Sequence, residues 1–225
     1  MKSNPVKKRA YLALFTVLFI LIVDQLIKIA VKTNMLLHEK IDVTSWFKIY
    51  FVENEGMAFG MDFIGTAILS VFRIVAVIGF SYLLVKSIQK RYPMGFIFCF
   101  SLVLAGAAGN IIDNCLYGLI FESSMPAGYG FSPANIVPLG EGYGSFLSGK
   151  VVDMFYFPLF VWPESFPLVG GQVFFSAIFN FADAAISCGA VAMLLFYHKY
   201  LTTSNEKVKN VKEDEHSSID HDPKA

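Results

Sequence analysis

The residues most able to do chemistry in this sequence are carboxylates embedded in apolar surroundings. Asp183 follows Asn180 by three residues in an apolar run, and Asp153 lies in the segment 150–155, Lys-Val-Val-Asp-Met-Phe. Apolar neighbours raise the pKa of a carboxyl group by desolvation, and a second carboxylate nearby separates the two pKa values. Two carboxylates that share one proton can activate a water molecule for hydrolysis. On residue types alone, a bundle-stabilising or ion-pathway role for these charges stays open beside the dyad.

Other polar side chains fall within apolar runs near the same predicted level: Asp24, Lys28, Arg73, Asn110 and Asp113. An ionisable side chain inside a membrane-spanning helix costs at least about 2.5–3.5 kcal/mol, so each one requires a partner or a function. Asp24 and Lys28 stand one helical turn apart and could neutralise each other. The amides could instead serve only in hydrogen bonds between helices. Convergence on one level nevertheless favours a shared polar site near the outer membrane interface.

The elements that would position these side chains are four apolar stretches. Each is long enough to cross a hydrocarbon core of about 30 Å, which takes about 20 helical residues. The stretches cover about 10–31, 65–85, 94–113 and 176–197. The chain is 55% hydrophobic and only 16% charged, whereas soluble domains are nearer to about a quarter charged. We therefore predict an all-α membrane protein with four transmembrane helices. Asp183 would lie about 10 Å inside the last one.

Lys and Arg residues indicate the orientation of these helices. They gather before the first span, between the second and third, and after the fourth: Lys2, Lys7, Lys8, Arg9, Lys86, Lys90, Arg91 and Lys199. The positive-inside rule then places both termini in the cytoplasm. Segments 32–64 and 114–175 would face outward, and the β-branched and aromatic residues of 41–60 predict a small extracytoplasmic β-rich element. The polar segment 202–225 is predicted to be a disordered cytoplasmic tail.

Composition argues against several functional classes. The formal net charge of +0 offers no basic surface for a nucleic acid. The three cysteines and four histidines form no Cys/His cluster and no His-Glu-x-x-His helix, so we expect neither a metal site nor a cofactor. A Gly-x-Ser-x-Gly nucleophile elbow is also missing from the sequence.

Four segments, in order, resemble motifs of the bacterial lipoprotein signal peptidases, also called signal peptidase II. They are Val-Asp-Gln-Leu-Ile-Lys at 23–28, Glu-Asn-Glu-Gly-Met-Ala-Phe-Gly at 53–60, Ala-Gly-Ala-Ala-Gly-Asn-Ile-Ile-Asp at 105–113, and Val-Val-Asp at 151–153 followed by Phe-Asn-Phe-Ala-Asp at 179–183. One such motif is weak, but all four in sequence are specific. The resemblance runs from the first predicted helix to the fourth and makes 1–201 a four-helix peptidase domain.

The resemblance implies a membrane aspartyl endopeptidase that cuts the signal peptide from prolipoproteins just before a diacylglyceryl-modified cysteine. Asp153 and Asp183 would be the catalytic pair, one acting as base toward water and the other donating a proton. Residues implied to bind substrate are Asn54, Gly56, Asn110 and Asn180, and those implied to support the site are Asp24, Lys28 and Asp113. A monomer in the bacterial cytoplasmic (inner) membrane is expected, with its site near the outer face and with prolipoproteins and membrane lipids as partners.

Two features depart from the family pattern. Asn114 stands where the family usually has arginine after the aspartate of its third motif, and we hypothesise that Arg73 supplies the missing charge. The segment 121–149 is longer than the usual link to the Val-Val-Asp motif. This segment could shield the site, bind a partner or be a passive insertion.

Two non-enzymatic alternatives make different predictions. A four-helix ion or proton pathway would explain the buried carboxylates, but it gives Asp153 no role and requires polar residues through the inner leaflet. Segments 96–104 and 189–196 are instead nearly all apolar, which counts against a pore. A membrane scaffold would retain its function when Asp153 and Asp183 are replaced by asparagine.

Overall fold

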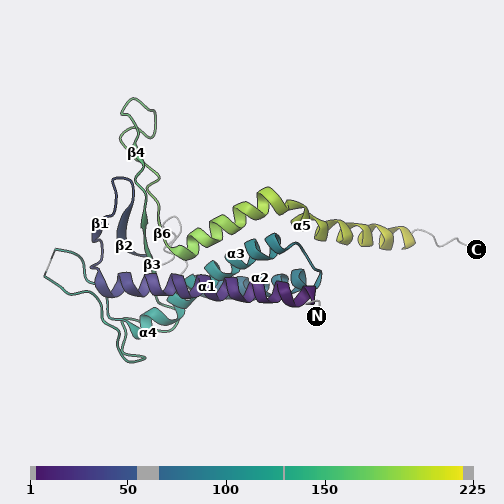
Figure 1. Ribbon diagram of the computed structural model, residues 1–225, viewed down its shortest axis with the longest axis horizontal. Helices are drawn as coiled ribbons and strands as arrows, with labels where there is room; N and C mark the ends of the chain where they lie inside the picture. The colour runs from purple at the N-terminus through teal and green to yellow at the C-terminus, as the bar shows by residue number, and fades with distance from the viewer. Residues whose placement is uncertain (1–3, 55–65, 129, 220–225) are drawn as a thin grey trace, which may run out of the picture.

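The computed structural model describes residues 4–54, 66–128 and 130–219, without the side chains of 66–69 and 202–219. Within this part of the chain, four helices are long and apolar enough to cross a membrane: Pro5–Asn34, Ser70–Gln89, Met94–Ile120 and Phe181–Leu201. The predicted number of spans is confirmed. Figure 1 shows these helices gathered into a bundle with the strands at one end. The cytoplasmic location of the termini and the outward location of 32–64 and 114–175 stay predictions.

The first helix, α1 (Pro5–Asn34), has an exposed apolar face and a buried face that carries charged side chains. Asn4 caps its start by accepting a hydrogen bond from the Val6 amide at 2.9 Å. Asp24, Lys28 and Lys32 recur every fourth residue, lie on one side of the helix and are fully buried. Large apolar side chains are exposed elsewhere on the helix, as expected for contact with lipid: Leu14, Phe15, Leu18, Ile22 and Leu26.

Helix α3 (Met94–Ile112) is the centre of the bundle and contacts α1, α2 (Thr66–Gln89) and α5 (Phe181–Ile219). Two glycines of α3 allow this helix to approach α1 and α5 closely. A Cβ atom at Gly106 would collide with the Ala182 carbonyl oxygen, and one at Gly109 would lie 2.8 Å from Oδ2 of Asp24. The helix does not end at Asp113 as the apolar run suggested. It continues through a π-helical turn, η1 (Asp113–Tyr117), into α4 (Gly118–Ile120).

The β-rich element is larger than predicted. Its four antiparallel strands lie in the order β1 (Lys40–Asp42), β2 (Lys48–Asn54), β3 (Val151–Tyr156) and β6 (Ile178–Phe179). The strands run across the direction of the helices, at the end of the bundle where α1 ends and α5 begins (Figure 1). Asp153 therefore belongs to a strand that lies outside the predicted β-rich segment 41–60. A second, two-stranded sheet pairs β4 (Phe160–Val161) with β5 (Val173–Phe174).

The last helix also starts later than predicted. Residues 178–179 pair with β3 instead of opening a helix, so α5 begins at Phe181. Asp183 consequently lies in the first turn of α5, and the predicted depth of about 10 Å is wrong. Helical backbone continues to Ile219; the predicted disorder of 202–225 stays a prediction.

Two apolar clusters hold the ends of the bundle together. One cluster, around Phe96, Ile97 and Phe100, packs the helices at the end away from the sheet. The other joins the sheet to α1 and to the end of the α3 helix, and its fully buried members are Phe51, Tyr117, Phe121, Val152 and Met154. Sheet and bundle thus share one core, which fixes β3 relative to the helices.

We predict that Gly106→Ala destabilises the protein by about 1–3 kcal/mol, because the new methyl group overpacks the α3–α5 contact. Thermal unfolding in detergent micelles measures the effect. Gly79→Ala on α2 is the matched control, since a Cβ atom there meets nothing within 4 Å. Equal melting temperatures for the two variants would show that the α3–α5 spacing is not set by Gly106.

Candidate active site

Two asparagines connect Asp153 and Asp183. Nδ2 of Asn180 donates to Oδ1 of Asp153 at 2.7 Å and to Oδ1 of Asn110 at 3.1 Å. Nδ2 of Asn110 in turn donates to Oδ1 of Asp183 at 2.8 Å. The structure thus brings together four of the residues identified from the sequence, although they come from β3, α3 and the start of α5.

The start of α5 fixes the position of Asp183. Asn180 precedes the first helical residue, and its Oδ1 accepts a hydrogen bond from the Asp183 amide at 2.8 Å. Oδ2 of Asp183 accepts one from the Asn180 amide at 3.4 Å. This reciprocal pattern is a capping box, with aspartate in the place usually taken by glutamate. A carboxylate in the first turn is also favoured by the positive end of the helix dipole.

Asp153 is held on both carboxyl oxygens. Its Oδ1 accepts from Asn180, and its Oδ2 accepts from Nδ2 of Asn54 at 3.3 Å. Asn54 ends β2, which pairs with β3 and places Val52 opposite Asp153. Gly56, the other loop residue predicted to bind substrate, lies outside the described residues.

Burial dominates the electrostatics of Asp153. The side chain is only 4% exposed. Desolvation, followed by the charge of Asp183, raises the pKa of Asp153 to about 7. Hydrogen bonds from Asn54 and Asn180 and the charge of Lys28 oppose this rise. Near neutral pH, the Asp153 carboxyl group therefore takes up and releases a proton readily.

A buried cation lies behind the pair. Nζ of Lys28 contacts Oδ2 of Asp24 at 3.0 Å, Oδ2 of Asp113 at 2.7 Å and Oδ1 of Asn110 at 2.8 Å. The Lys28, Asp24 and Asp113 side chains are fully buried. The predicted pairing of Asp24 with Lys28 is present, with Asp113 as a third member.

The two acids of this cluster also hold the backbone that carries the aspartate pair. Oδ1 of Asp24 accepts from the Ala182 amide at 2.9 Å, directly before Asp183. Oδ2 of Asp113 accepts from the Val152 amide at 3.4 Å, directly before Asp153. Each acid therefore links a helix to a catalytic candidate, and the cluster sets the spacing of β3 and α5.

Sequence reasoning assigned no role to Gln25, although it lies within the first motif. Nε2 of Gln25 donates to Oδ1 of Asp113 at 2.9 Å and to Oδ2 of Asp24 at 3.2 Å. Its Oε1 accepts from the Tyr117 hydroxyl at 3.2 Å. The signal that could have identified Gln25 is its position, because it is a polar residue next to Asp24 within a membrane-spanning helix.

Arg73 and Asn114 are direct partners. Nη1 of Arg73 donates to Oδ1 of Asn114 at 2.8 Å, and Nδ2 of Asn114 donates to the Gly149 carbonyl at 2.7 Å. The guanidinium charge acts on both Asp153 and Asp183. Arg73 therefore reaches the position at which the family motif carries its own arginine.

A second buried lysine, which sequence reasoning missed, connects the long 121–149 segment to the sheet. Nζ of Lys32 contacts Oε1 of Glu53 at 2.5 Å and Oγ of Ser124 at 2.9 Å. The ammonium group also lies 5.5 Å from the ring centre of Phe121 and 5.0 Å from that of Tyr143. Glu53 directly precedes Asn54, so this cluster supports the end of β2 that contacts Asp153.

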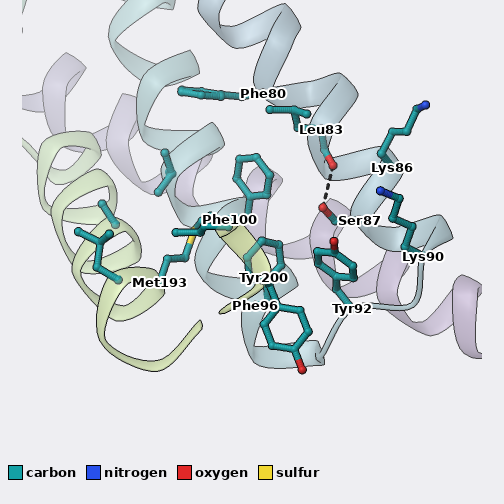
Figure 2. A pocket seen from close by; sticks show the side chains of 14 residues that line it. Phe80, Leu83, Lys86, Ser87, Lys90, Tyr92, Phe96, Phe100, Met193 and Tyr200 are labelled. Atoms are coloured by element: carbon teal, nitrogen blue, oxygen red, sulfur yellow. Dashed lines mark hydrogen bonds between the residues drawn. The ribbon is translucent and has the colours of Figure 1, made fainter. Parts of the chain in front are cut away.

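A hollow of about 510 Å³ lies at the other end of the bundle, between α2, α3 and α5. Figure 2 shows aromatic and aliphatic side chains lining it, with Lys86 and Lys90 at its edge. None of the predicted site residues lines this hollow. The candidate active site is instead the polar junction of helices and sheet.

Fold and site define an integral membrane protein with a carboxylate pair, one member of it buried, at one end of a four-helix bundle. The family model described as signal peptidase (SPase) II matches residues 16–199. The chain belongs to the signal peptidase II family and is an aspartic-type peptidase. The predicted family and enzyme class are confirmed, and membership in a peptidase family decides against the ion-pathway alternative.

Curated relatives agree with this assignment. The chain is 47% identical over 186 residues to the lipoprotein signal peptidase of Porphyromonas gingivalis (strain ATCC 33277), with 80% of each chain covered. It is 32% identical to that of Amoebophilus asiaticus (strain 5a2), covering 79% of this chain and 74% of the relative. A solved bacterial membrane enzyme, 22% identical, superposes with a TM-score of 0.56 over 86% of this chain and 90% of its own. This last likeness concerns the fold alone.

We predict that Lys28→Met destabilises the protein by about 3–5 kcal/mol, because Asp24 and Asp113 are left buried without a cation. Denaturant unfolding in micelles measures the change. Lys48→Met is the matched control, since the pair of Lys48 with Asp42 is exposed and worth at most about 1 kcal/mol. Similar losses in both variants would contradict a supporting role for the Lys28 cluster.

Proposed function

We propose that this enzyme cleaves the signal peptide from diacylglyceryl-modified prolipoproteins, with Asp153 and Asp183 as its catalytic pair. The observation that carries the proposal is the connection of the two carboxylates through Asn180 and Asn110, with Asp153 almost completely buried. The relatives named lipoprotein signal peptidase support the substrate class.

In the proposed mechanism, Asp183 is the base and Asp153 is the acid. Burial favours a proton on Asp153, which leaves Asp183, at the start of α5, as the partner that accepts one. Asp183 removes a proton from water as the water oxygen attacks the scissile carbonyl carbon. Asp153 donates its proton to the carbonyl oxygen. Collapse of the tetrahedral diol then breaks the C–N bond: Asp183 gives its proton to the leaving amine, and Asp153 takes a proton back from a hydroxyl group of the diol, which becomes the carboxylic acid.

The location of the pair suits a lipid-bound substrate. Asp183 lies in the first turn of a membrane-spanning helix and Asp153 in the sheet beyond the bundle. We place this level at the outer face of the cytoplasmic membrane, with both termini in the cytoplasm, as the distribution of Lys and Arg predicts. A prolipoprotein held by its acyl chains can then diffuse sideways to the site as substrate of a monomeric enzyme. Asn54 and Gly56 would contact its backbone.

We predict that Asp153→Asn and Asp183→Asn each reduce kcat by at least about a thousandfold, because one carboxylate alone supplies only base or only acid. Release of the signal peptide from a synthetic diacylglyceryl prolipoprotein in micelles measures the rate. Asp42→Asn, at an exposed acid on β1, is the control and should retain activity. Persistent cleavage by either site variant would refute the catalytic pair.

The pH dependence tests which carboxyl group is the acid. If Asp153 donates the proton, kcat/KM falls as pH rises through its pKa of about 7. The hydrogen bond from Asn54 stabilises the charged form, so Asn54→Ala should raise this pKa and move the alkaline limb to higher pH. A limb that moves to lower pH or stays in place would assign the titration to another group.

We predict that Arg73→Gln lowers kcat/KM about tenfold, because the site loses a cation that acts on both carboxylates. Adding Asn114→Arg to this variant returns a guanidinium to the position used by the family and should restore part of the activity. Both rates come from the same cleavage assay. Full activity of Arg73→Gln alone would show that its charge is not needed.

A further inference from the structure

The segment 157–175 forms an aromatic hairpin that extends from the sheet in the direction of its strands, beyond the bundle (Figure 1). β4 and β5 pair within it, with Phe160 opposite Phe174 and Val161 opposite Val173. The large apolar side chains exposed on the hairpin are Leu159, Phe160, Val161, Phe166, Leu168, Phe174 and Phe175. Glu164 is the single charged residue of this segment in the sequence. A patch of this kind marks an interaction site.

Both faces of this hairpin are apolar. On one face, Phe160 stacks on Phe174 with ring centres 4.7 Å apart, and Trp162 meets Phe174 edge-on at 5.7 Å. Val161 is 59% exposed on the other face. A two-stranded hairpin that stands alone is at best marginally stable in water. An apolar environment on the outside would stabilise it.

The tip supports the same conclusion. Leu168 is 97% exposed and has a φ of 69°, in the left-handed region that favours glycine. Neither packing within the described chain nor backbone preference favours leucine at this position. Transfer of this exposed leucine side chain out of water would lower the free energy of the protein.

The position of the hairpin indicates what covers it. β6 follows the hairpin and leads within two residues into α5, a membrane-spanning helix. The hairpin therefore starts at the level where α5 enters the bilayer, and it extends across the helix direction, along the membrane plane (Figure 1). Tryptophan, present here as Trp162, is typical of the membrane–water interface, and the segment has no Lys or Arg to bind an acidic partner.

We propose that the hairpin 157–175 lies in the lipid interface of the leaflet next to the active site and acts as an anchor. It joins β3, which carries Asp153, to β6, which leads to Asn180; Phe155 pairs with Phe179 at its base. Lipid contact therefore sets the depth of the aspartate pair in the bilayer. The lipid contact is independent of the peptidase chemistry, whereas its effect on cleavage rests on the proposed function.

Fluorescence tests the lipid contact directly. The chain has two tryptophans, so Trp46→Phe leaves Trp162 as the single reporter in the full-length protein. In phosphatidylcholine vesicles with brominated acyl chains, Trp162 emission should fall to about half or less of its intensity in unbrominated vesicles. Adding Leu168→Asp should weaken this quenching, and Leu168→Phe should preserve it. Equal emission of Trp162 in both kinds of vesicle would overturn the proposal.

Cleavage tests the consequence for depth. Leu168→Asp should slow cleavage of a vesicle-embedded prolipoprotein about tenfold while leaving the rate in detergent micelles within about twofold of wild type. Leu168→Phe should match wild type in both. Wild-type rates for Leu168→Asp in vesicles would refute the role in setting depth, even if Trp162 is quenched. An inactive wild-type enzyme would refute the proposed function alone, because the quenching is measured without substrate.

Discussion

The ammonium group of Lys28 is the interaction on which the site depends. A lysine with no exposed surface is strongly destabilising unless anions surround it, and Asp24 and Asp113 provide them at 3.0 and 2.7 Å. Each acid also accepts a hydrogen bond from the backbone amide just before a catalytic candidate, at Ala182 and Val152. One buried charge thereby connects α1, α3, α5 and β3, and the geometry of the carboxylate pair follows from its neutralisation.

The same exclusion of water that makes Lys28 dependent on its partners also acts on the pKa of Asp153. Desolvation is the first cause of its raised pKa, and the neighbouring Asp183 is the second. The amides of Asn54, Asn110 and Asn180 hold the pair without adding net charge. A cation in their place would favour ionisation of both carboxylates and remove the acid from the pair. Uncharged hydrogen-bond donors therefore preserve the difference between the two carboxyl groups that the proposed mechanism requires.

Features that depend on neighbouring residues could be predicted from the sequence, whereas features that depend on contacts between distant segments could not. The four spans follow from hydrophobic length, and the ion pair of Asp24 with Lys28 follows from their spacing of one helical turn. The strand that carries Asp153 has no such local signal, because Val151 and Val152 are buried only through pairing with β2 and packing against the end of the bundle. Similarly, the apolar residues 176–179 resemble the start of a helix, yet Ile178 and Phe179 pair with β3. The contact of Lys32 with Glu53 and Ser124 joins three separate segments, so no short pattern could indicate it.

The long segment between α4 and β3 is closed at its base. The Gly149 amide donates to the Asn114 carbonyl at 2.9 Å, and the Asn114 side chain donates back to the Gly149 carbonyl at 2.7 Å. Chain that leaves after Asn114 thus returns to the same point, whatever its length. The clasp therefore decouples the length of the segment above it from the placement of Asp113 and Val152, so a change of length between 121 and 149 need not displace either residue.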